Sequence, residues 1–217
     1  MAEVDICNMA LDRIGVDQDI ESLDDTSLRA RVCKRWYAHC RDVLLSDTPW
    51  NWALRVTALA EVSGDVPPGW SKQYRYPTDC LALKDVTDAG GSRYPLNQWY
   101  GAVFYGISYP WSMPRYSWEV RGEAENETGK IILVDCAVPY GLYVRRVTDP
   151  NQFDVQFTNT LAWGLAVEIA AGVKASADMR KQAAAAYAEC KASAVARFMR
   201  EARPDREPDS VSIQARA

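Results

Sequence analysis

The chain has a single histidine, His39, and its six cysteines are scattered without a CxxC pair. Two imidazole ligands from one chain are therefore impossible, and we expect no metal site. The phosphate-cradling loops GxxxxGK[ST] and GxGxxG do not occur, so we expect no nucleotide cofactor. No apolar run approaches the roughly 20 residues that span a bilayer, and Met1–Asp5 begins no secretory signal, so we expect no membrane partner.

Charge of either sign is not in large excess. The 217 residues are 48% hydrophobic and 25% charged, with a net charge of -4, as in an ordinary soluble globular chain. This balance argues against a dedicated nucleic-acid binder but permits a mildly negative wall that DNA passes without sticking. The cysteines stand mostly among apolar neighbours, which favours reduced, structural thiols and assembly in a cytoplasm. They are Cys7, Cys33, Cys40, Cys80, Cys136 and Cys190.

Helical periodicity marks both ends of the chain. It predicts a helix over 2–14 ended by Gly15, and a longer one over 27–46 with Asp24, Asp25 or Thr26 as its N-cap. The second helix has an apolar side of Leu28, Cys33, Trp36, Tyr37, Cys40 and Leu44, and a basic side of Arg29, Arg31, Lys34, Arg35 and Arg41. Helices resume from Asn151 and, after a break at 175–178, run to about Ala202. The last helix is rich in alanine, with Ala183 through Ala186 assigned to its apolar side, and such a helix is marginal in water unless it docks.

Between the second helix and the first strand lies the corner Asp47-Thr48-Pro49-Trp50-Asn51-Trp52-Ala53. Pro49 ends the helix, and the two tryptophans supply apolar mass where the pattern changes to alternation. We interpret the corner as an anchor that joins a helical layer to a β layer.

Alternation in the middle of the chain predicts a small antiparallel sheet, because the connections are too short for parallel crossovers. The predicted strands are 55–62, 74–76, 116–120, 130–134 and 142–147, with a turn at 65–69 and a hairpin at 123–129. The fold class is therefore α+β: a bundle of N- and C-terminal helices (1–54 and 150–202) with an inserted β domain (55–149). A C-terminal extension, 203–217, follows.

Two segments are candidate interaction surfaces. The turn-rich segment 89–115 is either a docking surface or a local cluster of its own aromatic residues, since Tyr and Trp suit both. Those residues include Trp99, Tyr100, Phe104, Tyr105, Tyr109 and Trp111. The extension has the composition of a disordered tail, yet Val211 and Ile213 alternate as an added strand would. It pairs with a partner or, alternatively, packs on its own chain.

Tests for catalytic chemistry fail, so we expect no enzyme. A Cys–His nucleophile pair would have to join His39 to a distant cysteine such as Cys80. Glu123, Glu125 and Glu127 with Asp135 offer oxygen ligands for a cation, but alternating acids in a hairpin are more typical of a solvated face.

Taken in order, several groups of residues resemble one known family. They are Ile6-Cys7-Asn8-Met9-Ala10-Leu11, Ile14-Gly15, Ile20-Glu21-Ser22-Leu23, Ala30, Cys33, Tyr37, Arg41-Asp42, Leu44, Pro49-Trp50, Trp52-Ala53, Gly69-Trp70, Tyr74-Arg75-Tyr76-Pro77, Asp79-Cys80-Leu81, Tyr143 to Asp149, Phe153, Phe157, Leu161-Ala162, Leu165-Ala166 and Ile169-Ala170. This series resembles the tail tubular protein A family, the head-to-tail adaptors of short-tailed bacteriophages. The resemblance extends to about residue 200 and is weakest over 89–115 and the extension.

The resemblance implies a structural virion protein in a ring of about twelve identical subunits, a closed heterologous assembly. Its partners would be the portal protein on one side and the tail nozzle protein on the other, with genomic DNA passing through the lumen during ejection. It assigns portal contact to Arg197, Arg200, Arg203, Arg206, Val211 and Ile213, and nozzle contact to the six aromatic residues of 89–115. The alternatives are another neck component (a stopper or tail-end protein) and a small cysteine or carboxylate hydrolase.

Overall fold

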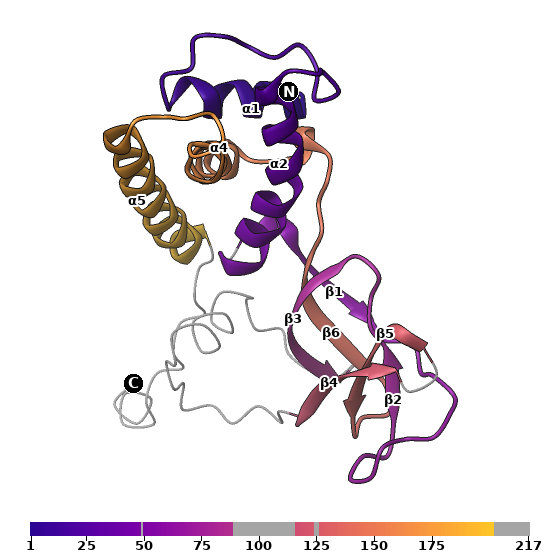
Figure 1. Ribbon diagram of the computed structural model, residues 1–217. Coiled ribbons are helices and arrows are strands. Elements are labelled where there is room, and N and C mark those ends of the chain that lie inside the picture. The colour runs from indigo at the N-terminus through magenta and orange to yellow at the C-terminus, as the bar shows by residue number, and fades with distance from the viewer. Residues whose placement is uncertain (49, 89–115, 124–125, 202–217) are drawn as a thin grey trace, which may run out of the picture.

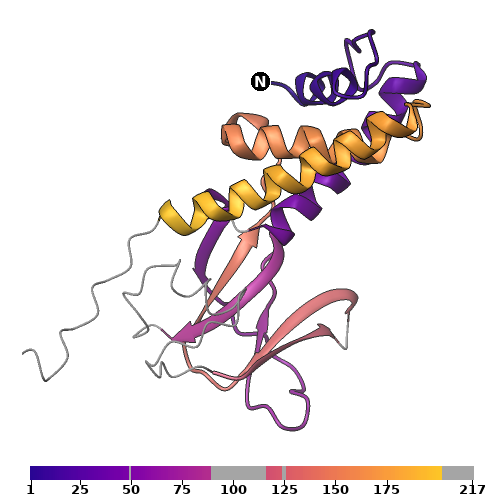
Figure 2. The same cartoon turned by 90° about the vertical axis from the view of Figure 1, so that its left-hand side faces the viewer.

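The computed structural model describes residues 1–48, 50–88, 116–123 and 126–201. The described part is α+β, as predicted, with helices at both ends of the chain and two small antiparallel sheets between them. Figure 1 shows the helices gathered at one end of the molecule and the sheets at the other. Figure 2, a quarter turn away, shows the same division, with α5 lying along the outside of the helical end.

The N-terminal helices are α1 (Glu3–Asp12) and α2 (Leu28–Asp47). Gly15 terminates the turn at the C-terminal end of α1, as predicted. Its φ is 72°, and the amide of Val16 donates to the carbonyl of Leu11 at 3.2 Å. The predicted N-caps of α2 were one to three residues too early. Ser27 is the cap, since its side chain accepts from the amide of Ala30, while Asp25 accepts from the amides of the preceding turn.

The C-terminal helices are α4 (Val155–Ile169) and α5 (Ala177–Glu201), preceded by the short η2 (Pro150–Gln152). α4 lies against α1 and α2, and α5 lies against α4. Gly164 permits the second contact, because a Cβ there would stand 2.9 Å from the ring of Tyr187. The alanine-rich apolar side was only partly right. Ala183 and Ala194 are buried, whereas Ala184 and Ala185 are exposed.

The single predicted sheet is two sheets. The first has the order β1 (Leu54–Ala58), β6 (Pro139–Arg145), β3 (Cys80–Asp88). The second has the order β2 (Gln73–Arg75), β5 (Asn126–Val134), β4 (Trp118–Glu123), so the predicted hairpin is the β4–β5 pair. Sequence alternation missed β3 entirely, because register shifts at Cys80/Ala82 and Leu83/Asp85 interrupt its period of two.

The chain after β1 connects the two sheets. The amide of Leu59, just after β1, still donates to the carbonyl of Pro139, the first residue of β6, at 2.9 Å. The next groups face the opposite way: the carbonyl of Ala60 accepts from Arg75, and the amide of Val62 donates to Gln73 of β2. One extended segment therefore pairs with β6 on one side and, further along, with β2 on the other.

The main hydrophobic core runs without interruption from the helices into the first sheet. It contains the buried faces of α1, α2 and α4 together with Trp50, Ala53, Val144 and Val147. A smaller core lies between the two sheets around Leu59, Tyr74, Val86, Ile132, Val134 and Cys136. Among the described helices, none combines the length and apolarity needed to cross a bilayer.

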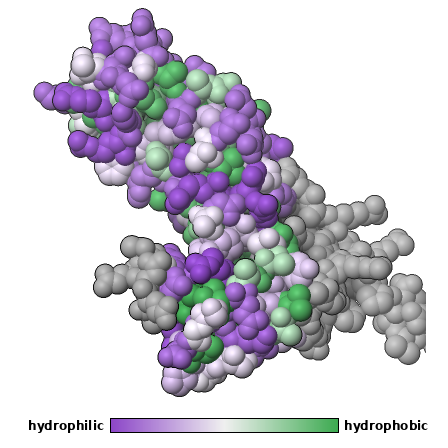
Figure 3. Space-filling model, turned by 90° about the vertical axis from the view of Figure 1, so that its right-hand side faces the viewer, coloured by the Kyte–Doolittle hydropathy of each residue, from purple (hydrophilic) through white to green (hydrophobic). Residues whose placement is uncertain are grey.

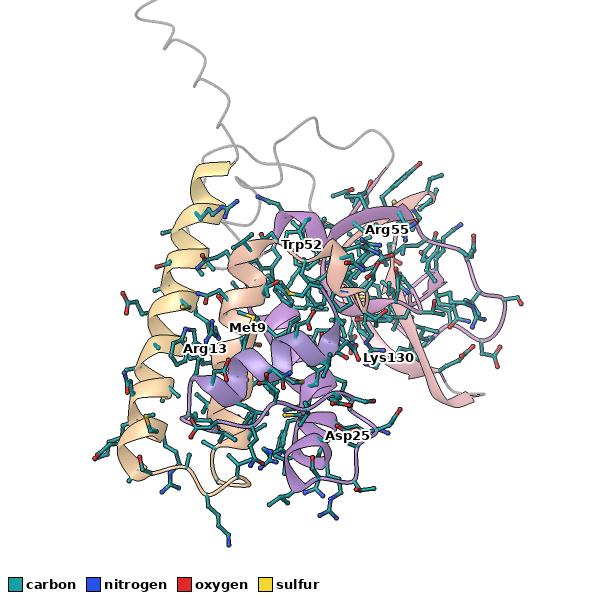
Figure 4. All side chains as sticks on the ribbon, turned by 90° about the horizontal axis from the view of Figure 1, so that it is seen from above. Met9, Arg13, Asp25, Trp52, Arg55 and Lys130 are labelled. Atoms are coloured by element: carbon teal, nitrogen blue, oxygen red, sulfur yellow. The ribbon has the colours of Figure 1, made fainter. Side chains whose placement is uncertain are left out.

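The predicted corner is the point where the two layers meet. Trp50 is 4% exposed, its indole N–H donates to the carbonyl of Leu44 at 3.0 Å, and its ring meets Phe157 of α4 edge-on at 5.0 Å. Trp52 lies in η1 (Asn51–Ala53), which leads into β1, and its ring also contacts that of Phe157, with 5.1 Å between the ring centroids. Seen from above, Trp52 lies at the boundary between the helices and the sheets (Figure 4). Pro49 lies outside the described residues.

We expect Trp50→Ala to lower the free energy of unfolding by about 3–5 kcal/mol, because it removes a buried aromatic ring and the hydrogen bond that its indole donates to the carbonyl of Leu44. The measurement is urea unfolding followed by circular dichroism. Val155→Ala is the matched control, since Val155 is 85% exposed at the start of α4 and should change stability by less than about 0.5 kcal/mol. Equal effects of the two substitutions would contradict the role of Trp50.

Candidate functional site

Of the predicted contact residues, only Arg197 lies where its surroundings are described. It is exposed on the last turns of α5. Arg200 belongs to the same helix, but its side chain is outside the described part, as are Arg203, Arg206, Val211 and Ile213. The predicted nozzle contacts Trp99, Tyr100, Phe104, Tyr105, Tyr109 and Trp111 are also outside it. The two candidate surfaces are therefore placed by the elements that precede and follow them.

The extension continues from the C-terminal end of α5, which lies nearer to the sheets than the N-terminal end does (Figures 1 and 2). The aromatic segment connects β3 to β4. These two flanking strands are in direct contact, because the indole N–H of Trp118 on β4 donates to the carboxylate of Asp85 on β3 at 3.1 Å. Both candidate surfaces thus begin from the framework formed by α5 and the sheets.

A polar network of several charged residues lies between the helices and the first sheet, a region that we call the helix–sheet joint. Asp42 of α2 accepts from Arg41 at 2.8 Å and from Arg146, just after β6, at 2.9 Å. Arg41 was predicted on the solvated basic side of α2 but is only 6% exposed. The structure places this cation inside the joint because a carboxylate from its own helix turn compensates the burial of its charge.

A second carboxylate continues the joint along the sheet. Asp79 accepts from the hydroxyl of Tyr143 on β6 at 2.8 Å and from Arg55 on β1 at 3.4 Å. Burial, with the hydrogen bond that the hydroxyl donates to Asp79, raises the pKa of Tyr143 to about 12. The tyrosine therefore remains a neutral donor to Asp79 at physiological pH. Arg55 lies on the sheet side of the molecule (Figure 4).

Lys84 of β3 completes the joint at the end of α2. Its ammonium donates to the carbonyl of Ser46 at 3.2 Å, in the last turn of α2, where the helix dipole attracts positive charge. Burial lowers the pKa of Lys84, and the nearby carboxylate of Asp47 opposes that effect. The indole of Trp50, which donates to the carbonyl of Leu44 alongside the amide of Thr48, and this ammonium both add donors to the last turn of α2.

A different cation lies on the other side of the bundle. The guanidinium of Arg13, at the end of α1, stacks on Trp163 at 4.4 Å and donates to the carbonyl and side-chain oxygens of Asn159 on α4. Burial lowers its pKa. Figure 4 shows Arg13 on the side of the bundle where α4 and α5 lie, so it helps to hold α1 on α4. Sequence reasoning missed this residue, since a lone arginine at a helix end carries no pattern.

The surroundings of His39 and Cys80 do not suit a Cys–His nucleophile pair. His39 is exposed on α2 and meets the ring of Trp36 edge-on at 5.7 Å. Cys80 is half-buried at the start of β3, and burial raises the pKa of its thiol to about 11. A thiol protonated to that extent is a poor nucleophile at neutral pH.

The acidic residues of the hairpin have protein partners where they are described. Glu123 lies 3.8 Å from the guanidinium of Arg75, and Asp135 accepts from both the amide and the hydroxyl of Ser71 at 2.7 Å. The side chains of Glu125 and Glu127 are outside the described part. Within the described residues, no group of three or more His, Cys, Asp or Glu side chains is placed to hold a metal ion.

The thiols are free, with Cys7, Cys33, Cys40 and Cys136 buried and the other two half-buried. This agrees with the prediction of structural cysteines. Burial raises the pKa of Cys40 to about 12, and a hydrogen bond with Cys33, together with burial, raises that of Cys7.

Compared with models of known protein families and with curated proteins, the chain matches none of them.

We expect Asp42→Asn to lower the free energy of unfolding by about 2–3 kcal/mol, because the buried Arg41 loses its counter-charge. Asp24→Asn is the control: the Asp24–Lys34 pair is exposed to solvent, which screens it, so its loss should change the free energy of unfolding much less. Urea unfolding of both variants measures the difference. A change no larger than that of the control would show that the joint does not depend on Asp42.

We expect Cys80 to react slowly with iodoacetamide at pH 8, with a thiolate fraction about a hundredfold below that of an ordinary cysteine. The rate should rise with pH up to about 11, because the raised pKa keeps the thiol protonated until then. Mass spectrometry of the labelled peptide measures this, with the urea-unfolded chain as reference and Cys80→Ser to assign the peptide. Equal rates in the folded and unfolded chains at pH 8 would contradict the burial effect.

Proposed function

We propose that this chain is a structural virion protein that forms a head-to-tail adaptor ring. The ring joins the capsid portal to the tail nozzle and forms part of the channel through which DNA leaves. Its work is binding and ring closure, without catalytic turnover.

The observation that supports this proposal is where the residues of the family resemblance lie. Those of α1 and α2 are mainly core residues: Ile6, Cys7, Ala10, Leu11, Ile14, Cys33, Tyr37 and Leu44 are all buried. Arg41-Asp42, Trp50, Asp79 and Tyr143 form the helix–sheet joint. Residues that resemble the family in order and spacing thus belong to one connected framework, which favours a shared fold over a chance match of surface motifs.

The proposed contacts follow from the framework. The end of α5, with Arg197, Arg200, Arg203 and Arg206, would present cations to the portal. The segment between Asp88 and Tyr116 would present aromatic side chains to the nozzle, where rigid amphipathic rings make good anchors. Identical subunits would close the ring through faces on opposite sides of the molecule.

Two alternatives remain in different classes. Another neck component, such as a stopper or tail-end protein, shares the ring logic and differs in its neighbours. A small cysteine or carboxylate hydrolase is less favoured, because the protonated thiol of Cys80 and the exposed position of His39 do not make a nucleophile and base.

We expect deletion of residues 203–217 to leave a soluble, folded protein and to weaken its attachment to a portal ring. The described core ends before this segment, and the deletion removes cations assigned to the portal. The measurement is the mass of the purified chain, alone and mixed with portal rings, by native mass spectrometry with circular dichroism as the folding control.

The full-length chain should gain ring-sized mass on portal rings. A full-length chain indifferent to them would overturn the adaptor role and favour the other neck components. Unchanged attachment of the shortened chain would overturn the assignment of portal contact to the extension.

A further inference from the structure

The outer edge of β1 is a place where a further strand can pair. Over Leu54–Ala58, β1 pairs with β6, and no strand in the described part of the chain pairs with its other side. Groups that bind β6 alternate along the strand with groups that point away. Because Leu59 donates toward β6, the amides and carbonyls of Leu54, Val56 and Ala58 point to the outer edge.

This outer edge is apolar and exposed. Val56 is 51% exposed, Ala58 and Ala60 are exposed on the same face, and Val138, 53% exposed, lies beside Ala60 by continuation of the β1–β6 register. The lower half of Figure 3, where the sheets lie, shows apolar side chains at the surface on the side of the molecule away from α5. Exposed apolar edges of this kind are templates for pairing, and proteins normally cover them.

Just after β1, the same side of the chain already pairs with a strand, because Ala60 and Val62 form backbone hydrogen bonds with β2. An added strand beside Val56 and Ala58 would therefore extend a pairing surface that the fold begins. Its side chains on the Val56 face should be apolar, and its backbone should be free of proline over about four or five residues.

We propose that residues 210–214 of a second copy of this chain occupy the outer edge of β1. The sequence Ser210-Val211-Ser212-Ile213-Gln214 alternates apolar and polar side chains, and both prolines of the extension precede it. Val211 and Ile213 then lie on the face of Val56 and Ala58. This inference rests on the proposed function for its ring arrangement and changes one assignment in it. The arginines of the extension are left for the portal, whereas Val211 and Ile213, which the resemblance assigns to portal contact, bind the neighbouring subunit instead.

The position of α5 favours a second copy over the same chain. In Figure 1, α5 is on the left of the molecule and the outer edge of β1 faces right, with β6 and β3 between them; in Figure 2, which looks from that left-hand side, α5 lies at the front. The eight residues 202–209 span about 30 Å when fully extended, which is the reach of the extension before the pairing segment begins. A donor on one side and an acceptor on the other give a heterologous contact, the kind that closes into rings.

The test is photo-crosslinking in the full-length chain. A benzophenone amino acid replaces Ile213, isotopically light and heavy chains are mixed, and mass spectrometry identifies the crosslinked peptides. The expected result is a light–heavy crosslink between residue 213 and the β1 peptide. The same photo-reactive residue at Val155, exposed on α4, is the control and should not reach β1. Crosslinks within one chain only, or none to β1, would overturn the proposal.

A matched pair of variants adds an energetic test. Val211→Asp with Ile213→Asp places two charges on the apolar face of the added strand and should weaken self-association about tenfold or more. Ser210→Asp with Ser212→Asp adds the same charge on the opposite face and should change it less than about threefold. Sedimentation velocity measures both. Equal effects would mean that no strand face is recognised.

The outcomes separate this inference from the proposed function. A light–heavy crosslink to β1 in a chain that ignores portal rings would keep the pairing and overturn the adaptor role. Attachment to portal rings without any crosslink to β1 would keep the adaptor role and overturn the pairing.

Discussion

The fold depends on how α2 ends. The last carbonyls of a helix lack the partners that interior carbonyls have, and in α2 that of Leu44 accepts from the cap amide of Thr48. The indole of Trp50 and the ammonium of Lys84 donate to two of them, from the corner and from β3 respectively. Because the ring of Trp50 also meets Phe157, the same residue fixes the end of α2, the start of the β region and the position of α4.

Charge reinforces this arrangement across the joint. Asp42 lies between two arginines, one on its own helix and one just after β6, and Asp79 connects β6 to β1. An arginine buried to the extent of Arg41 is costly without a carboxylate, so its burial and the position of Asp42 depend on each other. The helices and the first sheet are therefore joined by a continuous core and by paired charges at its margin.

Sequence patterns predicted the elements that have a simple period and missed those that do not. The helices, the Gly15 turn and the tryptophan corner followed from periodicity and from proline and glycine chemistry. β3 was missed because its register shifts break alternation, and Arg41 was misplaced because helical spacing does not reveal that the adjacent Asp42 pairs with it and compensates its burial. Leu28, 50% exposed at the first turn of α2, was placed on the buried apolar side because helical spacing does not show which turns of a helix contact a neighbouring element. The predicted contact residues are concentrated in segments without such periods, so sequence reasoning could name them but could not place them.

α5 shows how a helix can be held by one face while its other face stays exposed. Its buried contacts come from one side, through Ala183, Ala194 and the ring of Tyr187 on Gly164, while Ala184, Ala185, Ala188 and Ala192 are exposed. Alanine favours the helix but contributes little buried area, so α4 supplies much of what holds α5 in place. A helix held on one face can keep its own structure while its other face and its C-terminal end remain available.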